Sequence, residues 1–168
     1  TKDVFNLIIS ADLLTATNVP GQSSEMFRVL RPGGGVAWFG YPTGVGGSLS
    51  NWPVLDAWVR AGISATNALI QTDSGRSVKV TRNALAGGGT WSHGYGDPGN
   101  TACSQDQRIV GTGMRLQWFG MPGPRGMIDR GCRNPQPLSV NGVLFNEGLN
   151  RLSAQDAYNG RIYWSLEI

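Results

Sequence analysis

The side chains best suited to metal binding or nucleophilic chemistry in this sequence are His93, Cys103 and Cys132. One imidazole and two thiols could supply three of the four ligands of a zinc ion, but their spacing is wider and less regular than in zinc fingers. The alternatives are two unpaired thiols or one disulfide. No G-x-S-x-G turn accompanies His93, which argues against a serine hydrolase, and no C-x-x-C-H motif is present for covalent haem. We therefore predict no metal site and assign no catalytic residue.

A second group of chemically capable residues lies in the stretch 120–134, which is rich in glycine and proline. Asp129, Arg130 and Arg133 occur there in a connection too long for an ordinary hairpin, and long loops with paired charges often line ligand sites. The competing interpretation is a solvated Arg–Asp pair that stiffens a surface loop and contributes little energy. These three residues are the first candidates for a ligand site in the second half of the chain.

Strands and helices are predicted to alternate in the first half of the chain. The nearly continuous apolar run at 4–10 is typical of a strand that is covered on both faces of a sheet. Pro32 and the glycines after it should end a helix, because proline cannot continue the hydrogen-bond ladder. The predicted elements are a strand at 4–10, a helix from Ser23 or Ser24 to the residues before Pro32, a strand at 36–39, a helix from Asn51 to Gly62, and strands at 63–72 and 77–82.

The run R-V-L-R-P-G-G at 28–34 resembles the segment that leads into the fifth strand of class I S-adenosylmethionine-dependent methyltransferases. The upstream run V-F-N-L-I-I-S-A-D-L-L at 4–14 looks like the fourth strand of that family and its following loop. The resemblance reaches to about residue 82 and implies an α/β fold, the C-terminal half of a Rossmann-like methyltransferase sheet. It further implies S-adenosylmethionine as the cofactor of the parent protein.

The methyltransferase resemblance implies only an incomplete cofactor site. The family's glycine-rich loop and the acidic residue after its second strand are missing, and the glycines at 33–35 follow a helix instead of opening one. What remains is Ser10, Ala11 and Asp12, at the edge of the cleft for S-adenosylmethionine or substrate. Asp12 could orient a substrate or a cofactor amine; the alternative is a solvated loop residue or a local cap.

The second half of the chain is predicted to be all-β. A glycine-rich linker at 83–96 separates the two halves, and after it helical spacing gives way to short apolar runs and turn residues. Asn-Gly pairs at 141–142 and 159–160 predict tight hairpins. The predicted strands lie at 116–119, 137–140, 143–146, 151–156 and 161–166.

Ala154, Asp156, Gly160 and Trp164 match the A-x-D-x-x-x-G-x-x-x-W pattern of quinoprotein blades. The resemblance implies that 97–168 begins a PQQ-like β-propeller, with one blade at about 137–168 in which Trp164 docks against the next blade. It also makes pyrroloquinoline quinone a possible cofactor. The adjacent cysteine pair that often holds the quinone is not present, so dehydrogenase activity is in doubt.

Composition excludes several classes of function. The net charge of +3 over 168 residues is spread evenly, and its densest arginine cluster contains Asp129, so no nucleic-acid partner is predicted. No apolar run is long enough to span a bilayer. Two cysteines do not decide the compartment, and both cytoplasm and periplasm stay open.

Taken together, the sequence is interpreted as a fragment of a bacterial fusion protein, with a methyltransferase-like segment at 1–82, a linker at 83–96 and the start of a propeller at 97–168. The leading hypothesis is a parent that transfers methyl groups from S-adenosylmethionine and uses the propeller to bind a small-molecule or protein substrate or a partner. The alternative is a quinoprotein-like binding or redox propeller with a vestigial methyltransferase domain. The fragment itself is expected to be inactive.

Overall fold

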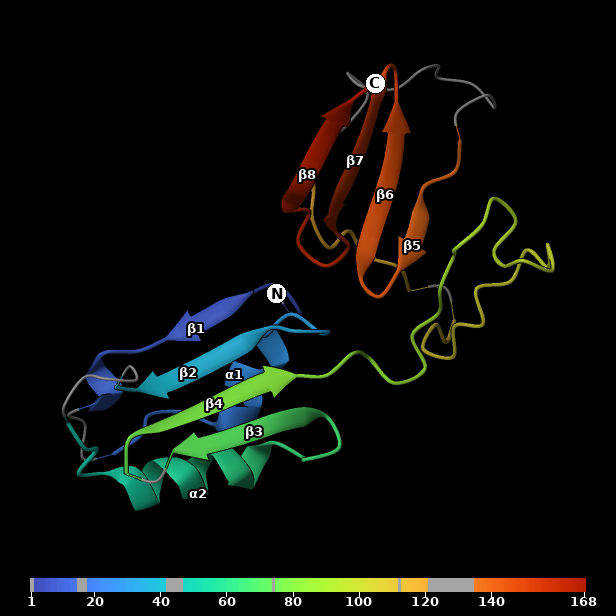
Figure 1. Cartoon of the computed structure of the whole chain (residues 1–168). Coiled ribbons are helices and arrows are strands. Elements are labelled where there is room, and N and C mark those ends of the chain that lie inside the picture. Colours follow the sequence, from blue (N-terminus) through green and yellow to red (C-terminus); the bar gives the residue numbers. More distant parts are fainter. Residues whose placement is uncertain (1, 15–17, 42–46, 74, 112, 121–134) are drawn as a thin grey trace. The chain divides into compact units, whose positions relative to one another are not determined.

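The structure is a computed structural model that describes residues 2–14, 18–41, 47–73, 75–111, 113–120 and 135–168. The chain divides into two compact units, Thr1–Ala84 and Leu85–Ile168. Each unit contains one four-stranded sheet, and both are labelled in Figure 1.

The first unit is a mixed sheet with two helices. Its elements are β1 (Leu7–Ile9), the 3-10 helix η1 (Asp12–Leu14), α1 (Ser23–Val29), β2 (Val36–Gly40), α2 (Trp52–Gly62), β3 (Ala68–Asp73) and β4 (Ser77–Arg82). The strand order is β1-β2-β4-β3. β1 runs parallel to β2, whereas β4 is antiparallel to both of its neighbours.

The core of this unit lies between one face of the sheet and the helices (Figure 1). Phe39 of β2 and Val80 of β4 point to this face and are buried, together with Leu55 and Val59 of α2. Pro53 in the first turn and the spacing of Leu55 and Val59 place α2 as the sequence predicts.

The predicted α/β fold is wrong. The described part of the chain is mostly β, two four-stranded sheets with only two short α-helices of 7 and 11 residues, and it is not the half of a Rossmann-like sheet. The run at 4–10 suggested a strand buried on both faces, but β1 is a three-residue edge strand in which Leu7 and Ile9 are 57% and 66% exposed. A continuous apolar run does not show whether one or both faces of the sheet are covered, because the sequence is the same in both cases.

A largely buried arginine, Arg82, joins the end of β4 to α1 and to the start of the chain. Arg82 Nη1 lies 2.7 Å from Asp3 Oδ1, and both side chains are 12% exposed. The same nitrogen donates to the carbonyl oxygens of Phe27 (3.1 Å) and Leu30 at the C-terminal end of α1. The guanidinium carbon also lies 4.9 Å from the centre of the Phe27 ring.

The second unit contains only strands among its described elements, and an all-β architecture fits it. They are β5 (Leu138–Val140), β6 (Val143–Gly148), β7 (Arg151–Asp156) and β8 (Ile162–Glu167), which pair antiparallel in chain order. Asn141 and Gly142 both have positive φ in the β5–β6 hairpin, as the Asn-Gly turn predicts. The strand predicted at 116–119 is not formed there; Leu116 and Phe119 are 81% and 91% exposed, and only Trp118 of this segment is partly buried.

The glycine-rich segment that begins the second unit is fastened to a later loop. Asp106 accepts hydrogen bonds from the backbone amides of Gly89 (2.8 Å), Arg108 (2.8 Å) and Ile109 (2.9 Å). The Gln107 amide donates to the Gly87 carbonyl at 2.9 Å. Within the described residues this part of the predicted linker is therefore tied down and does not act as a free tether. None of the helices in the described ranges has the length and apolarity needed to cross a membrane.

Candidate functional site

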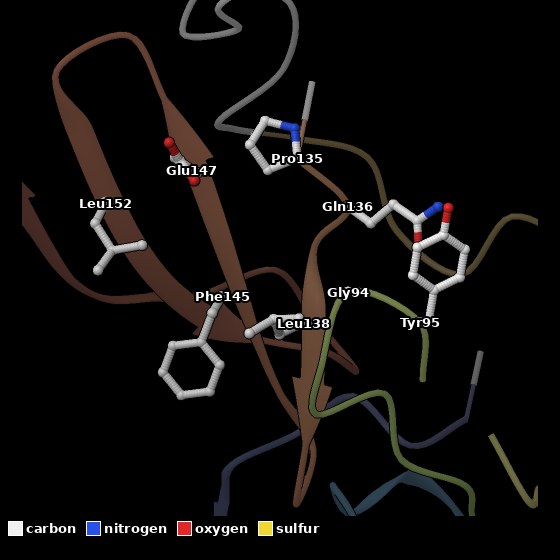
Figure 2. Close-up of a pocket in the computed structure, with 8 residues that line it drawn as sticks. All are labelled: Gly94, Tyr95, Pro135, Gln136, Leu138, Phe145, Glu147 and Leu152. Carbon is white, nitrogen blue, oxygen red and sulfur yellow. The ribbon is translucent and has the colours of Figure 1, made fainter. Parts of the chain in front are cut away.

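A cavity of about 400 Å³ lies on the second unit, at one face of its sheet (Figure 2). Its walls come from β5, β6 and β7 and from two segments near β5. The lining residues are Gly94, Tyr95, Pro135, Gln136, Leu138, Phe145, Glu147 and Leu152. The volume falls within the range of roughly 300–1,000 Å³ that is usual for small-molecule sites.

The floor of the cavity is set by strand register. Leu138 of β5 pairs with Phe145 of β6, and Glu147 of β6 pairs with Leu152 of β7. Paired residues share a face in an antiparallel sheet, and so do alternate residues along one strand. The three apolar side chains and the carboxylate must therefore lie on the same face, as Figure 2 shows.

The second wall is a short hairpin held against the edge of β5. Trp91 and Ser139 exchange two backbone hydrogen bonds, at 2.7 and 2.8 Å. The chain then turns back within a few residues, since the amide of Ser92 donates to the carbonyl of Gly96 at 2.8 Å. This turn places Tyr95 beside the strand, with 66% of its surface exposed.

Asp97 braces the backbone that follows Tyr95. It accepts hydrogen bonds from the hydroxyl (2.6 Å) and the amide (3.2 Å) of Thr101. The adjacent Ala102 amide donates to the Tyr95 carbonyl at 3.0 Å. The hydrogen bonds from Thr101, that from its hydroxyl first, lower the pKa of the Asp97 carboxyl below its ordinary value of 3.8.

We expect this loop to loosen in acid. The pKa of Asp97 is lower in the folded chain than in the unfolded chain, because the hydrogen bonds from Thr101 favour the charged carboxylate. These hydrogen bonds therefore stabilise the loop fully above the unfolded-state pKa, near 3.8, and the stabilisation is lost as the pH falls through the folded-state pKa. An NMR titration of the Asp97 carboxyl should give a midpoint below 3.8, and the Thr101 amide shift should follow it. Thr101→Val, which lacks the hydroxyl donor, should raise the midpoint; an unchanged midpoint in this variant would contradict the assignment.

The cavity combines apolar walls with a single carboxylate. Leu138, Phe145 and Leu152 are half-buried, whereas Glu147 is exposed at the rim. Among the described lining residues Glu147 and Tyr95 are the only ionisable groups, and none is a serine, cysteine, histidine or lysine. This arrangement can bind and orient a ligand, but it offers no nucleophile paired with a base.

The predicted ligand residues fall elsewhere. Asp129, Arg130 and Arg133 lie outside the described residues. Ser10, Ala11 and Asp12 belong to the first unit, where they follow β1, and Asp12 opens η1 with an exposed side chain. Because β1 and β2 are parallel, their carboxyl ends meet at this edge. The described part of the edge carries Asp12 and, at the end of β3, Asp73, which pairs with Arg76.

The four residues of the blade-like motif belong to β7, β8 and the turn that connects them. Asp156 is fully buried and accepts hydrogen bonds from the Tyr158 amide and the Tyr163 hydroxyl, both at 2.8 Å. Gly160 has φ +74°, and a Cβ there would lie 2.5 Å from the ring of Trp118. Ala154 is buried and pairs with Trp164, whose ring centre lies 6.3 Å from that of Phe145.

The residues considered for zinc are not gathered in the described structure. His93 Nδ1 lies 2.9 Å from the Ser92 hydroxyl, and Cys103 is an exposed thiol. Cys132 lies outside the described residues. In the ranges that the structure describes, no group of three or more His, Cys, Asp or Glu side chains could hold a metal ion.

No family model, curated protein or solved structure matches this chain. Assignment of a site therefore depends on its geometry alone. Sequence reasoning missed the cavity because its hairpin wall lay in the predicted linker. No alternation on β6 signals it, because Val143, Leu144 and Phe145 are apolar at consecutive positions and mark no single apolar face.

Proposed function

We propose that the second unit is a binding module that takes a small apolar group of a ligand into the cavity between the sheet and the Tyr95 hairpin. The observation that carries this proposal is the cavity itself, with Leu138, Phe145 and Leu152 on a floor fixed by strand register. Surface apolar groups that gather around a hollow are typical of ligand sites. This role agrees with the substrate-binding or partner-binding function expected for the second half.

Pyrroloquinoline quinone does not fit this cavity. The quinone is a polycarboxylic acid, and such a ligand requires arginine, lysine or clustered amide donors. The ionisable groups that line the described cavity are Glu147 and Tyr95, and Glu147 would repel the ligand. We therefore propose binding, without quinone chemistry, as the function of this site.

Methyl transfer from S-adenosylmethionine is the second candidate function. One observation favours it: the parallel pair β1 and β2 brings Ser10–Asp12 and the end of β2 to the same edge of the first sheet. Asp12 has an exposed carboxylate there that could meet the ammonium of the cofactor. No other described residue supplies the rest of a cofactor site, so no step of the reaction is assigned.

Two titrations, each followed by NMR, test the two candidates. Benzyl alcohol, a neutral aromatic probe, should shift the amide signals of Leu138, Phe145 and Leu152 with a millimolar dissociation constant. Tyr95→Ala should weaken binding at least threefold, and the matched control Phe119→Ala, which removes an exposed aromatic ring outside the cavity, should not. Saturable shifts elsewhere only would overturn the proposal. S-adenosylmethionine, titrated separately, should shift Ala11 and Asp12 if the second candidate holds, and Asp12→Ala should abolish this effect.

A further inference from the structure

We propose that the ligand of this cavity is an organic cation, an ammonium group carried on an apolar or aromatic body. The inference rests on the proposed binding function and adds the charge of the ligand. The inference depends on Glu147, which lines the cavity beside apolar and aromatic groups and which none of the other described lining residues neutralises.

The Glu147 carboxylate has no counter-ion among the described residues. Within the part of the chain that the structure describes, neither an ion pair nor a hydrogen bond engages this side chain. The nearest arginine along the two paired strands is Arg151, which alternates to the opposite face and donates to the Ser165 hydroxyl at 2.6 Å. The negative charge is therefore available to a ligand.

The aromatic walls favour the same class of ligand. A cation is attracted to the face of a tyrosine or phenylalanine ring, and this attraction adds to that of a carboxylate. Tyr95 and Phe145 both line the cavity, and Leu138, Leu152 and Pro135 supply surface for an apolar body. Gln136 adds an amide that can accept a hydrogen bond from an ammonium.

An anionic ligand is disfavoured by the same groups. None of the described lining residues is basic, so a carboxylate or phosphate would meet Glu147 without a compensating positive charge. A neutral ligand of the same shape would keep the apolar contacts and lose the ionic one. The three classes of ligand can thus be ranked as cation, neutral molecule and anion.

The test compares three probes that share one ring: benzylammonium, benzyl alcohol and benzoate, each followed by NMR titration of the full chain at low salt. Benzylammonium should bind roughly two- to fivefold more tightly than benzyl alcohol, the range expected of an exposed ionic contact, and benzoate should bind most weakly. Glu147→Gln, which keeps the side-chain shape, should reduce the preference for the cation to the part contributed by the aromatic rings and leave benzyl alcohol unchanged. The matched control Glu167→Gln, on the other face of the sheet, should change nothing.

The outcomes separate this inference from the function on which it rests. Equal binding of benzylammonium and benzyl alcohol, with Tyr95→Ala weakening both, would overturn the cation and keep the binding site. A cation preference that is undiminished in Glu147→Gln would also overturn the inference, because the carboxylate would then contribute nothing to it. Absence of saturable shifts at the cavity with all three probes would overturn the binding function and the inference together.

Discussion

Replacement of Arg82 by alanine is expected to lower the free energy of unfolding of the first unit by about 3 kcal/mol, as is typical when one partner of a buried ion pair is removed. The loss has three sources. Asp3 keeps a charge that is 12% exposed and loses its partner at 2.7 Å. The carbonyl oxygens of Phe27 and Leu30 lose their donor, and the Phe27 ring loses the guanidinium above it.

The measurement is a urea titration followed by the amide signals of Val78 and Val80, which are buried in the core of the first unit. Arg60→Ala is the matched control. Arg60 pairs with Asp56 at 3.0 Å, but it is 53% exposed, so its loss should cost less than about 0.5 kcal/mol. If Arg82→Ala costs no more than this control, Arg82 holds neither Asp3 nor α1 to the sheet.

Local elements of the first unit could be predicted because their signals are local. Pro53 after Asn51 marks the start of α2, and the alternation of Val78 and Val80 with polar residues marks β4. The fold class could not be predicted in the same way. It depends on how many layers cover the sheet, and Leu7 and Ile9 have the same side chains whether that face is covered or bare.

In the second unit the β5–β6 hairpin was predictable and the cavity was not. The tight Asn159-Gly160 turn predicted between β7 and β8 is wrong, because only Gly160 has positive φ and the connection is longer than two residues. Asn141-Gly142 sets both the turn and the register that brings Leu138 opposite Phe145. The other wall depends on the pairing of Trp91 with Ser139, two residues far apart in the chain. Sequence periodicity cannot predict this contact, because periodicity reveals helices and strands of several residues and a single pair of bridging residues forms neither.

The charged residues predicted to bind a ligand are not the charged residue that lines the cavity. Asp129, Arg130 and Arg133 were selected because they cluster in sequence, but they lie outside the described residues. Glu147 carries no signal in the sequence, because a single glutamate on a strand is usually a solvated residue. Its importance comes from its neighbours on adjacent strands, which only the register reveals.

The largest effect in the second unit is expected at Asp156. Asp156→Ala should lower the free energy of unfolding of this unit by about 3 kcal/mol, because it removes two hydrogen bonds to a charged acceptor, each worth roughly 1.5–3 kcal/mol before relaxation. The Tyr158 amide and the Tyr163 hydroxyl would both lose their acceptor. Asp156 is fully buried at the end of β7, so water cannot replace the missing carboxylate without opening the turn.

Smaller substitutions at the same place separate the two hydrogen bonds. Tyr163→Phe removes only the hydroxyl and should cost about 1 kcal/mol, whereas Asp156→Asn keeps one acceptor oxygen and should fall between the two. Glu167→Ala, an exposed acid on β8, serves as the control and should change stability by less than about 0.5 kcal/mol. Urea unfolding followed by the Ala154 amide measures the stability of all four variants.

Equal losses in Asp156→Ala and Tyr163→Phe would mean that the tyrosine hydroxyl alone accounts for the stabilisation and that the hydrogen bond from the Tyr158 amide contributes nothing. The turn would then be held by Gly160 and the Trp118 ring beside it instead of by the buried carboxylate.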